Sequence, residues 1–424
     1  MNTTRRTFLT QAATFAGVSA IAPSSLMAAG GKVGANDRIT VAGIGLGPRG
    51  REDLKAFLSQ PDVQFVAIAD VQESRREIIR KTVNRHYGNE DCKAYIDMRD
   101  ILGRDDIDAV LIATGDRWHG TASIMAARAG KDIYCEKPCT MSIAECQELD
   151  AAVTGNKRIY QGGMQRRNVD NFQLAATLAR TGKLGKLHTL HAGIWLPVPV
   201  VTNLPEQPEP DPAVCDWNRW CGPAPKHPYN ETYVRGQWRH YQGFSAGWGL
   251  HDWASHTLNL CQWVADADDT APVEYWLENN ELCALYASGM KLVMRLAGFG
   301  KEGDWLGLGS CPVRFEGDKG WVEAGDFSKI AYSDDAIAGG MTHAEMMGTD
   351  PTKHVREFLN SIRSRKPTAC NASVVRHTEV ACHAAAISWK LGRRLKFDPA
   401  KEQFIGDSEA NALCSYQRRA PFMV

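Results

Sequence analysis

The sequence predicts an α/β protein whose N-terminal part is a doubly wound parallel sheet and whose remainder is an α+β domain with an open, mainly antiparallel sheet. Up to about residue 160, short apolar runs alternate with helical patterns, which is typical of a parallel sheet covered by helices. From about residue 273, strand-like runs are separated by turn signals such as residues 317–320 (GDKG). With 424 residues, the chain is long enough for both parts.

A glycine-rich loop follows the first apolar run, residues 38–44. The loop contains Gly45, Gly47, Pro48, Arg49 and Gly50, and a helical pattern follows over residues 52–59. In a GxGxxG loop the glycines allow a tight turn, close approach of the backbone to a pyrophosphate, and close packing of the helix on the strand. Proline is tolerated in the first helical turn, because its missing N–H would be unpaired there.

An acidic residue ends the second apolar run, residues 63–69. Asp70 stands twenty residues after Gly50, where a carboxylate accepts hydrogen bonds from ribose hydroxyls and repels a 2′-phosphate. The combination predicts a Rossmann dinucleotide-binding domain over residues 36–162. It favours NAD over NADP, although Arg75 nearby leaves room for the phosphorylated form.

Polar residues also follow the next two predicted strands. Residues 107–113 run into Thr114, Trp118 and His119, with a helical pattern over 121–129, and residues 131–135 run into Glu136-Lys137-Pro138. Ligands of such sheets bind outside the carboxyl ends of the strands. Glu-Lys-Pro alone is more often a charged turn, but in this position it places Lys137 at the ligand crevice.

A later helical pattern, residues 250–264, carries Asp252 and His256. These residues are neighbours on one side of a helix, so the carboxylate could tune the basicity of the imidazole. Taken alone, such a pair is more often a surface pair.

These motifs together resemble the Gfo/Idh/MocA family of NAD(P)-dependent sugar and cyclitol oxidoreductases. The segments 163–167, 217–229 and 252–256 extend the resemblance over nearly the whole mature chain, toward a largely bacterial branch in which twin-arginine signals are common. Two departures concern the substrate: Gly115-Asp116-Arg117 stands where the family more often has Pro-Asp-His, and Asn259 where it often has Asp.

The resemblance implies roles for individual residues. His256 takes or relays a hydroxyl proton, Asp252 orients it, and Lys137 hydrogen-bonds the same oxygen. The implied cofactor-binding residues are Gly45, Gly47, Pro48, Arg49, Gly50, Asp70, Thr114, Trp118, His119, Glu136 and Lys137. The implied substrate-binding residues are Gln165, Arg166, Arg167 and Trp238, although a solvated polar loop would explain the first three equally well.

The expected function is oxidation of a ring secondary hydroxyl of a sugar, glycoside or cyclitol, with hydride transfer to a tightly bound nicotinamide. One alternative is an NAD-dependent glycosidase that works by transient oxidation and elimination. Residues 249–253 (GLHDW) disfavour it, since that branch typically carries a Tyr-Pro-Thr-His-Gly-like stretch. A second alternative is a non-catalytic sugar-binding relative, against which the presence of Lys137, Asp252 and His256 argues.

Residues 163–424 are expected to form the substrate-binding and oligomerisation domain, with a homodimer or homotetramer by family analogy. Within it, residues 196–245 form a long aromatic, proline-rich segment. This segment is either a wall for stacking on sugar rings or a loop packed over the second sheet.

Residues 1–30 are predicted to be a twin-arginine export signal. Arg5-Arg6 precedes a weakly apolar run that is too short for a membrane span, and no Asp or Glu occurs before Asp37. The alternative is a disordered basic terminus. The signal predicts a periplasmic protein, with the segment either cleaved or kept as an anchor.

Charge and cysteine usage exclude several other functions. Lys+Arg and Asp+Glu both total 49, which gives no electrostatic case for nucleic acid or an anionic membrane surface. The 12 cysteines form no CxxC pair and no zinc-type Cys/His spacing. The sequence therefore predicts small core residues and free thiols, with a few disulfides as the alternative, and no metal site.

Overall fold

The computed structural model describes residues 34, 37–198, 200–297 and 304–424. The predicted export signal, residues 1–30, lies outside these described residues. Ile39–Val424 forms one unit of the chain, and all contacts below lie within it.

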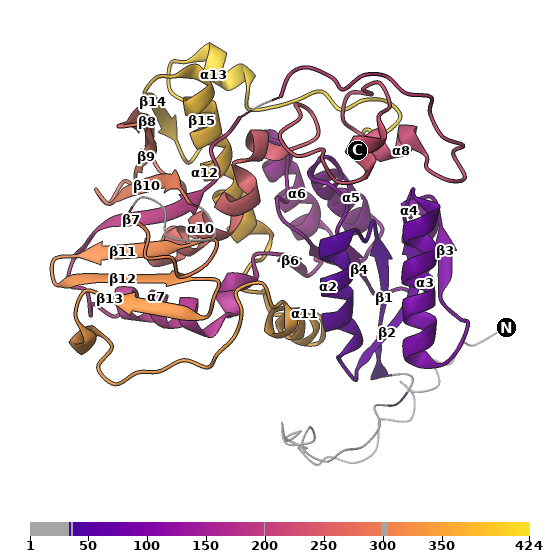
Figure 1. The fold of residues 1–424 in the computed structure, drawn as a ribbon, viewed down its shortest axis with the longest axis horizontal. Coiled ribbons are helices and arrows are strands. Elements are labelled where there is room, and N and C mark those ends of the chain that lie inside the picture. The colour runs from indigo at the N-terminus through magenta and orange to yellow at the C-terminus, as the bar shows by residue number, and fades with distance from the viewer. Residues whose placement is uncertain (1–33, 35–36, 199, 298–303) are drawn as a thin grey trace, which may run out of the picture. The chain divides into compact units, whose positions relative to one another are not determined.

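The first sheet of this unit has six parallel strands in the order β3-β2-β1-β4-β5-β6 (Figure 1). Its strands are β1 (Ile39–Ile44), β2 (Val63–Ala69), β3 (Lys93–Tyr95), β4 (Ala109–Ile112), β5 (Asp132–Cys135) and β6 (Tyr160–Gly162). From β1 the chain adds β2 and β3 on one side of the sheet. It then returns to the other side of β1 and adds β4, β5 and β6 there. This reversal opens a crevice at the carboxyl ends of the strands. The predicted Rossmann domain is confirmed.

The helices of this part are α2 (Pro48–Leu58), α3 (Glu73–Tyr87), α4 (Met98–Leu102), α5 (Asp116–Arg128) and α6 (Ile143–Gly155). Two of them begin earlier than predicted. Helix α2 starts at Pro48, because proline at the first position needs no hydrogen-bond partner for its nitrogen. Helix α5 starts at Asp116, whose carboxylate suits a helix N-terminus, so Trp118 and His119 lie on its first turn.

The second sheet has nine strands in the order β13-β12-β11-β7-β10-β9-β8-β14-β15. Its strands are β7 (Leu187–Ile194), β8 (Glu274–Glu278), β9 (Glu281–Leu285), β10 (Lys291–Leu296), β11 (Val313–Gly317), β12 (Gly320–Gly325), β13 (Lys329–Tyr332), β14 (Leu395–Asp398) and β15 (Gln403–Phe404). Only β7 and β10 pair in parallel, so the prediction of a mainly antiparallel sheet is confirmed. Strand β7 was not predicted, and it lies inside the sheet.

Helices α7 (Asp170–Arg180), α10 (His251–Val264) and α12 (Ala372–Leu391) pack against this sheet, and their apolar side chains share one core with it. The other elements of this half are the short helices α8 (Trp217–Cys221), α9 (Glu231–Val234) and α13 (Ser408–Ala412), and the 3₁₀ turns η2 (Gln165–Asn168), η3 (Ala246–Gly249) and η4 (Asp335–Ile337).

Helix α11 (Thr352–Ser364) leaves this second half and packs beside α2 of the first (Figure 1). The ring of Phe358 meets Phe57 edge to face, with centroids 6.2 Å apart. Arg356 forms two hydrogen bonds, of 2.7 and 2.9 Å, with the buried carboxylate of Asp62. The nucleotide-binding part is therefore completed by a helix from late in the chain.

The aromatic segment 196–245 packs largely on itself, and the prediction that it forms a wall for sugar rings stays a prediction. Trp217, Trp220 and Tyr233 form a small core of their own with their neighbours. The segment joins the first half through a bridge between Gln72 and Cys215. It thus lies against the Rossmann part, and most of its aromatic surface is used internally.

All twelve cysteines lie within the described residues, and all are free. Eleven are buried and Cys414 is half-buried, as predicted for small core residues. Among the described helices, none combines the length and the apolar character that crossing a bilayer requires.

Candidate active site

Two cavities meet at the carboxyl edge of the first sheet. The larger, the dinucleotide groove, has a volume of about 360 Å³, and the predicted residues that line it are Gly45, Asp70, Thr114, Trp118 and Trp238. The smaller, the Lys137 cavity, has about 190 Å³, and the predicted residues that line it are Arg49, Thr114, His119, Glu136, Lys137, Gln165, Arg166, Trp238 and His256. Thr114 and Trp238 line both. Gly47, Pro48, Gly50, Arg167 and Asp252 line neither.

The glycine loop at the groove has the geometry that the sequence predicts. Gly45 has φ +66°, and a Cβ there would lie 2.3 Å from Cγ2 of Thr114. A Cβ on Gly50 would lie 2.8 Å from that of Ala113 at the end of β4. Glycine at these positions lets α2 approach the sheet, and Gly47 caps the N-terminus of α2, a kind of helix end that favours an anion.

Asp70 fits the ribose of a dinucleotide. Its Oδ1 accepts a hydrogen bond of 2.9 Å from the N–H of Gln72, whereas its buried Oδ2 has no partner among the described residues. Burial raises the pKa of Asp70, and Arg75 and the Gln72 N–H oppose this rise. A ribose hydroxyl would donate to Oδ2 and satisfy the carboxylate.

Arg117 is a groove residue that the sequence analysis missed as a contact. Its Nε donates to the carbonyl of Trp220 at 2.6 Å, and its guanidinium lies 3.4 Å from the centre of the Trp220 ring. Burial lowers its pKa to about 10, so the group keeps its charge at neutral pH. Its Nη1 has no partner within the described part of the chain and offers a donor to a phosphate or an amide.

The C-terminal tail also reaches the groove, which the sequence did not predict. The tail runs from α13 across to α8 (Figure 1), where Arg419 donates to carbonyls of Asn218 and Gly222 at 2.9 Å. Residues 421–424 then line the groove together with Trp220, and Phe422 packs edge to face on Trp118. The groove is therefore roofed by two segments that are distant in sequence.

Lys137 and Asp252 form an ion pair across 115 residues of sequence. Lys137 Nζ donates to the main-chain oxygen of Asp252 at 2.6 Å and to its Oδ1 at 2.8 Å. Burial alone would raise the pKa of Asp252, but Lys137 and Arg239 outweigh it and lower the pKa to about 2. The carboxylate and the main-chain oxygen of Asp252 thus fix Lys137 Nζ in the cavity wall.

His256 lines the same cavity, but within the described residues it forms no hydrogen bond or ion pair with Asp252, whose carboxylate is bonded to Lys137 instead. No described residue forms a hydrogen bond with its ring, and its Nδ1 is buried. Burial, followed by the charges of Arg166, Lys137 and Arg49, lowers its pKa well below the usual value. His256 is therefore a neutral imidazole.

His119 is a second neutral imidazole on the cavity wall. Its Nδ1 lies 2.6 Å from the carbonyl oxygen of Pro138, and since a carbonyl only accepts, Nδ1 carries the proton. Its buried Nε2 is then a free acceptor. Burial lowers its pKa.

Glu136 and Arg49 support the floor of the cavity. Arg49 donates to Glu136 at 3.1 Å and to the carbonyl of Thr349 at 2.9 Å, and it pairs with the buried Asp53 at 2.8 Å. Arg49 therefore faces the Lys137 cavity and not the phosphate-binding loop.

The three polar residues of η2 have different surroundings. Gln165 and Arg166 line the cavity, and each has a buried polar atom without a partner among the described residues, Oε1 and Nη1. Arg166 is held by two hydrogen bonds, of 2.9 and 2.6 Å, to Asp326. These free atoms suit a hydroxylated ligand.

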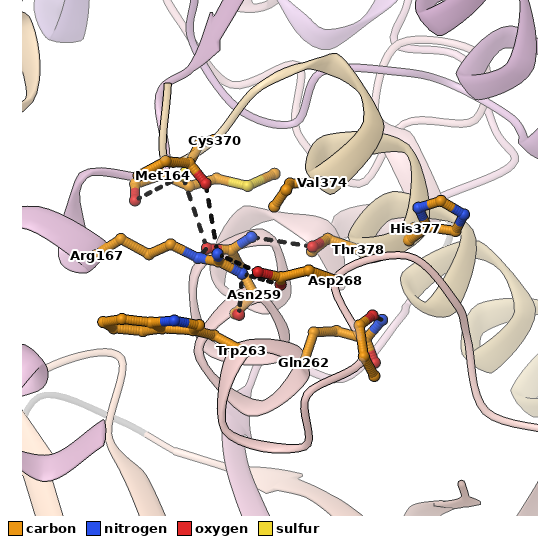
Figure 2. A network of polar contacts seen from close by, with 12 residues as sticks. Met164, Arg167, Asn259, Gln262, Trp263, Asp268, Cys370, Val374, His377 and Thr378 are labelled. Carbon is orange, nitrogen blue, oxygen red and sulfur yellow. Dashed lines mark hydrogen bonds and ion pairs between the residues drawn. The ribbon is translucent and has the colours of Figure 1, made fainter. Parts of the chain in front are cut away.

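Arg167 instead lines neither cavity and points into a polar network with Asn259 and Asp268 (Figure 2). Its guanidinium donates to Oδ1 of Asn259 at 2.7 Å and to the carboxylate of Asp268 at 2.5 and 2.8 Å, and it lies 5.4 Å from the Trp263 ring. Its guanidinium hydrogen bonds go to α10, to the turn after it and to the carbonyl of Ala369. Asn259 likewise faces this network and not the Lys137 cavity.

Asp116 and Arg239 also line the Lys137 cavity, although neither was predicted. Oδ2 of Asp116 accepts a hydrogen bond of 3.0 Å from the N–H of Ala246, and burial raises its pKa. The position of Asp116 at the start of the helix that follows β4 could have identified it, since that edge of the sheet carries other site residues.

Comparison with known proteins places this geometry in context. Residues 38–164 match the model of an oxidoreductase family with an NAD-binding Rossmann fold, named GFO_IDH_MocA. Residues 197–291 and 316–424 match the C-terminal alpha/beta domain of the same family.

Individual relatives match over little more than a third of this chain. A myo-inositol 2-dehydrogenase of Thermotoga maritima is 30% identical over 163 residues, which cover 38% of this chain and 46% of the relative. A glycosyl hydrolase family 109 protein of Shewanella sp. is 28% identical over 160 residues, which cover 36% and 34%. The matches thus span less than half the length of these curated relatives.

Solved structures share the fold over a longer part of the chain. An aldose-aldose oxidoreductase of Caulobacter crescentus, crystallised with glycerol, superposes with a TM-score of 0.60 at 18% identity. The match covers 85% of this chain and 100% of that chain.

Proposed function

The chain belongs to the Gfo/Idh/MocA family of oxidoreductases, and from this premise we propose that it oxidises a ring secondary hydroxyl of a sugar, glycoside or cyclitol, with NAD favoured over NADP. The observation that carries the proposal is the Lys137–Asp252 pair next to His256, in a polar cavity that shares Thr114 and Trp238 with the dinucleotide groove.

A bound nicotinamide dinucleotide supplies the hydride acceptor. Lys137 donates a hydrogen bond to the substrate oxygen and stabilises the negative charge that develops on it. The neutral imidazole of His256 accepts or relays the hydroxyl proton. Asp252 acts through Lys137, because its charge holds the ammonium group in place.

The polar wall of the cavity favours a polyhydroxylated substrate. Gln165 offers an acceptor, Arg166 a donor and His119 an acceptor, and each would otherwise stay unpaired in a buried place at a cost of about 1–3 kcal/mol. An apolar alcohol would leave these groups unsatisfied.

The roof over the groove supports a tightly bound cofactor. Trp220 and residues 421–424 line the same groove as Gly45 and Asp70. A nucleotide in the groove would leave only after part of this roof moves. We therefore propose a resident cofactor, which also suits the proposed export through Arg5-Arg6, since a folded protein would carry its nucleotide to the periplasm.

Denaturing mass spectrometry of gently purified protein tests this proposal. About one NAD per chain that survives dialysis is the expected result, together with reduction of that NAD by a member of a panel of cyclitols and hexoses. An empty groove with weak, freely reversible NAD binding would contradict the resident cofactor. Bound NAD that no panel member reduces would favour a non-catalytic relative.

The similarity to a glycosyl hydrolase family 109 protein favours one second candidate, a glycosidase. Such an enzyme would oxidise a ring carbon transiently, eliminate the aglycone, add water to the resulting double bond and then reduce the ring carbon again. Nitrophenyl glycosides separate the two functions. Release of nitrophenol without net NADH would identify the glycosidase, whereas NADH formation without nitrophenol would identify the dehydrogenase.

A further inference from the structure

We propose that His251, Glu379 and His383 bind a divalent transition-metal ion of the Zn²⁺ class behind the active site. Their candidate ligand atoms all lie within 4.8 Å of one another, and all three residues are buried. The proposal goes beyond the function proposed above and does not depend on it.

Two packed helices supply the three residues. Glu379 and His383 are four residues apart on α12, so they share one face of it. His251 is the first residue of α10, which packs against α12. His251 Nε2 lies 3.6 Å from Glu379 Oε2, close to the roughly 3.4 Å between ligands of a tetrahedral ion with bonds of about 2.0–2.1 Å.

The cluster leaves polar atoms unsatisfied that an ion would satisfy. His251 is fully buried, and neither of its ring nitrogens has a hydrogen-bond partner among the described residues. Oε2 of Glu379 is also buried without a partner. Buried polar groups are rarely left in this state, and two imidazoles with one carboxylate are a typical donor set for zinc.

Neighbouring hydrogen-bonding groups hold Glu379 and His383 in orientation. Oε1 of Glu379 accepts a hydrogen bond of 2.8 Å from Ser255 and one of 3.4 Å from the N–H of Cys139, which leaves Oε2 to face His251. Thr140 Oγ1 lies 3.4 Å from His383 Nε2. Such partners fix the orientation of metal ligands.

An ion could reach the cluster from outside. His383 lines a cavity of about 460 Å³ whose wall also includes Ser245 and the exposed Val201. The oxygen-rich coordination that Mg²⁺ and Ca²⁺ need is not available from two imidazoles. The donor set therefore selects a transition-metal ion.

The ion would join the two elements that build the catalytic pair. His251 is adjacent to Asp252, and Glu379 is bonded to Cys139, two residues after Lys137. We therefore assign the ion a stabilising and positioning role and no contact with substrate.

The test uses the full chain, dialysed against a chelator and then given one equivalent of Zn²⁺. We expect about one ion per chain after gel filtration and a higher unfolding temperature. Glu379→Gln and His383→Gln should each bind Zn²⁺ at least about tenfold more weakly. His377→Gln is the matched control, because His377 lies on the same helix and bonds the carbonyl of Ser373 instead.

Co²⁺ provides a readout that does not depend on folding of the variants. Wild-type protein loaded with Co²⁺ should show the visible absorption of a four-coordinate ion without a thiolate charge-transfer band. A thiolate band would assign the ion to the cysteines and overturn the proposal. Failure of the wild type to retain an ion, or equal retention by Glu379→Gln, would also overturn it.

Discussion

Replacing Lys137 by methionine should abolish most of the turnover and leave nucleotide binding intact. Lys137 gives two hydrogen bonds of 2.6 and 2.8 Å to Asp252, and the two side chains are only 14% and 16% exposed. Loss of one preorganised donor costs about 2.7–4 kcal/mol in the transition state. We therefore expect kcat to fall by at least about a hundredfold.

Lys137→Met should lower the free energy of unfolding by less than the loss of a partner from a fully isolated buried ion pair. Removing one partner of a buried pair costs about 3–5 kcal/mol. Asp252 keeps Arg239, whose Nε lies 3.4 Å from its carboxylate, so we expect a loss near the lower end. A typical domain, stable by about 5–15 kcal/mol, remains folded after such a loss.

The assay follows NADH absorbance with the best substrate of the panel, and NAD binding by quenching of tryptophan fluorescence. Lys131→Met is the matched control: this lysine lies before β5 and donates only to the carbonyls of Arg104 and Ile107. The Lys131→Met variant should lose stability and keep kcat.

His256→Ala should also lower turnover at least about a hundredfold without loss of NAD. Near-normal turnover in a folded Lys137→Met, His256→Ala double variant would refute the assignment.

Four further outcomes are expected. Asp70→Ser should shift the ratio of NAD to NADP affinity by about tenfold or more toward NADP, which is about 1.4 kcal/mol; an unchanged ratio in a binding titration would contradict the role of its free Oδ2. Because the pKa of Asp252 falls from 3.8 to about 2 on folding, its contribution is present above pH 3.8 and lost as the pH falls through 2. The difference in unfolding free energy between wild type and Asp252→Asn, about 2 kcal/mol by linkage, should therefore shrink across that window in denaturant titrations; a constant difference would refute the ion pair. Deleting residues 421–424 should speed loss of NAD during dialysis while Arg419 keeps the rest of the tail in place, and identical retention would show that the tail is no part of the roof. Arg167→Leu should lower the free energy of unfolding by about 3–5 kcal/mol and leave KM unchanged, whereas a selective rise in KM would indicate a substrate contact after all.

The nucleotide-binding part could be predicted closely because its signals are local. Gly45 and Gly50 are required by contacts with the neighbouring strand, and Asp70 follows its own strand. Each of these positions depends on a short strand-turn-helix unit. The sequence of such a unit determines its backbone with little help from the rest of the chain.

The site beyond that unit could be predicted only in part, because its contacts are long-range. Spacing on one helix suggested that Asp252 would lie beside His256, but the fold pairs it with Lys137. Arg166 and Arg167 are adjacent on a 3₁₀ turn, and the sequence alone does not indicate which of the two lines the Lys137 cavity. The roof over the groove depends on a tail more than three hundred residues away from Gly45.

The return of α11 to α2 has a consequence for synthesis of the protein. Helix α2 ends at Leu58, and α11, which covers its Phe57, begins only at Thr352. At about 5–20 residues per second, the ribosome needs roughly 15–60 s to make the intervening chain. During that time Phe57 lacks its contact with Phe358, so the packing of the N-terminal part of the chain is completed only after α11 has been made.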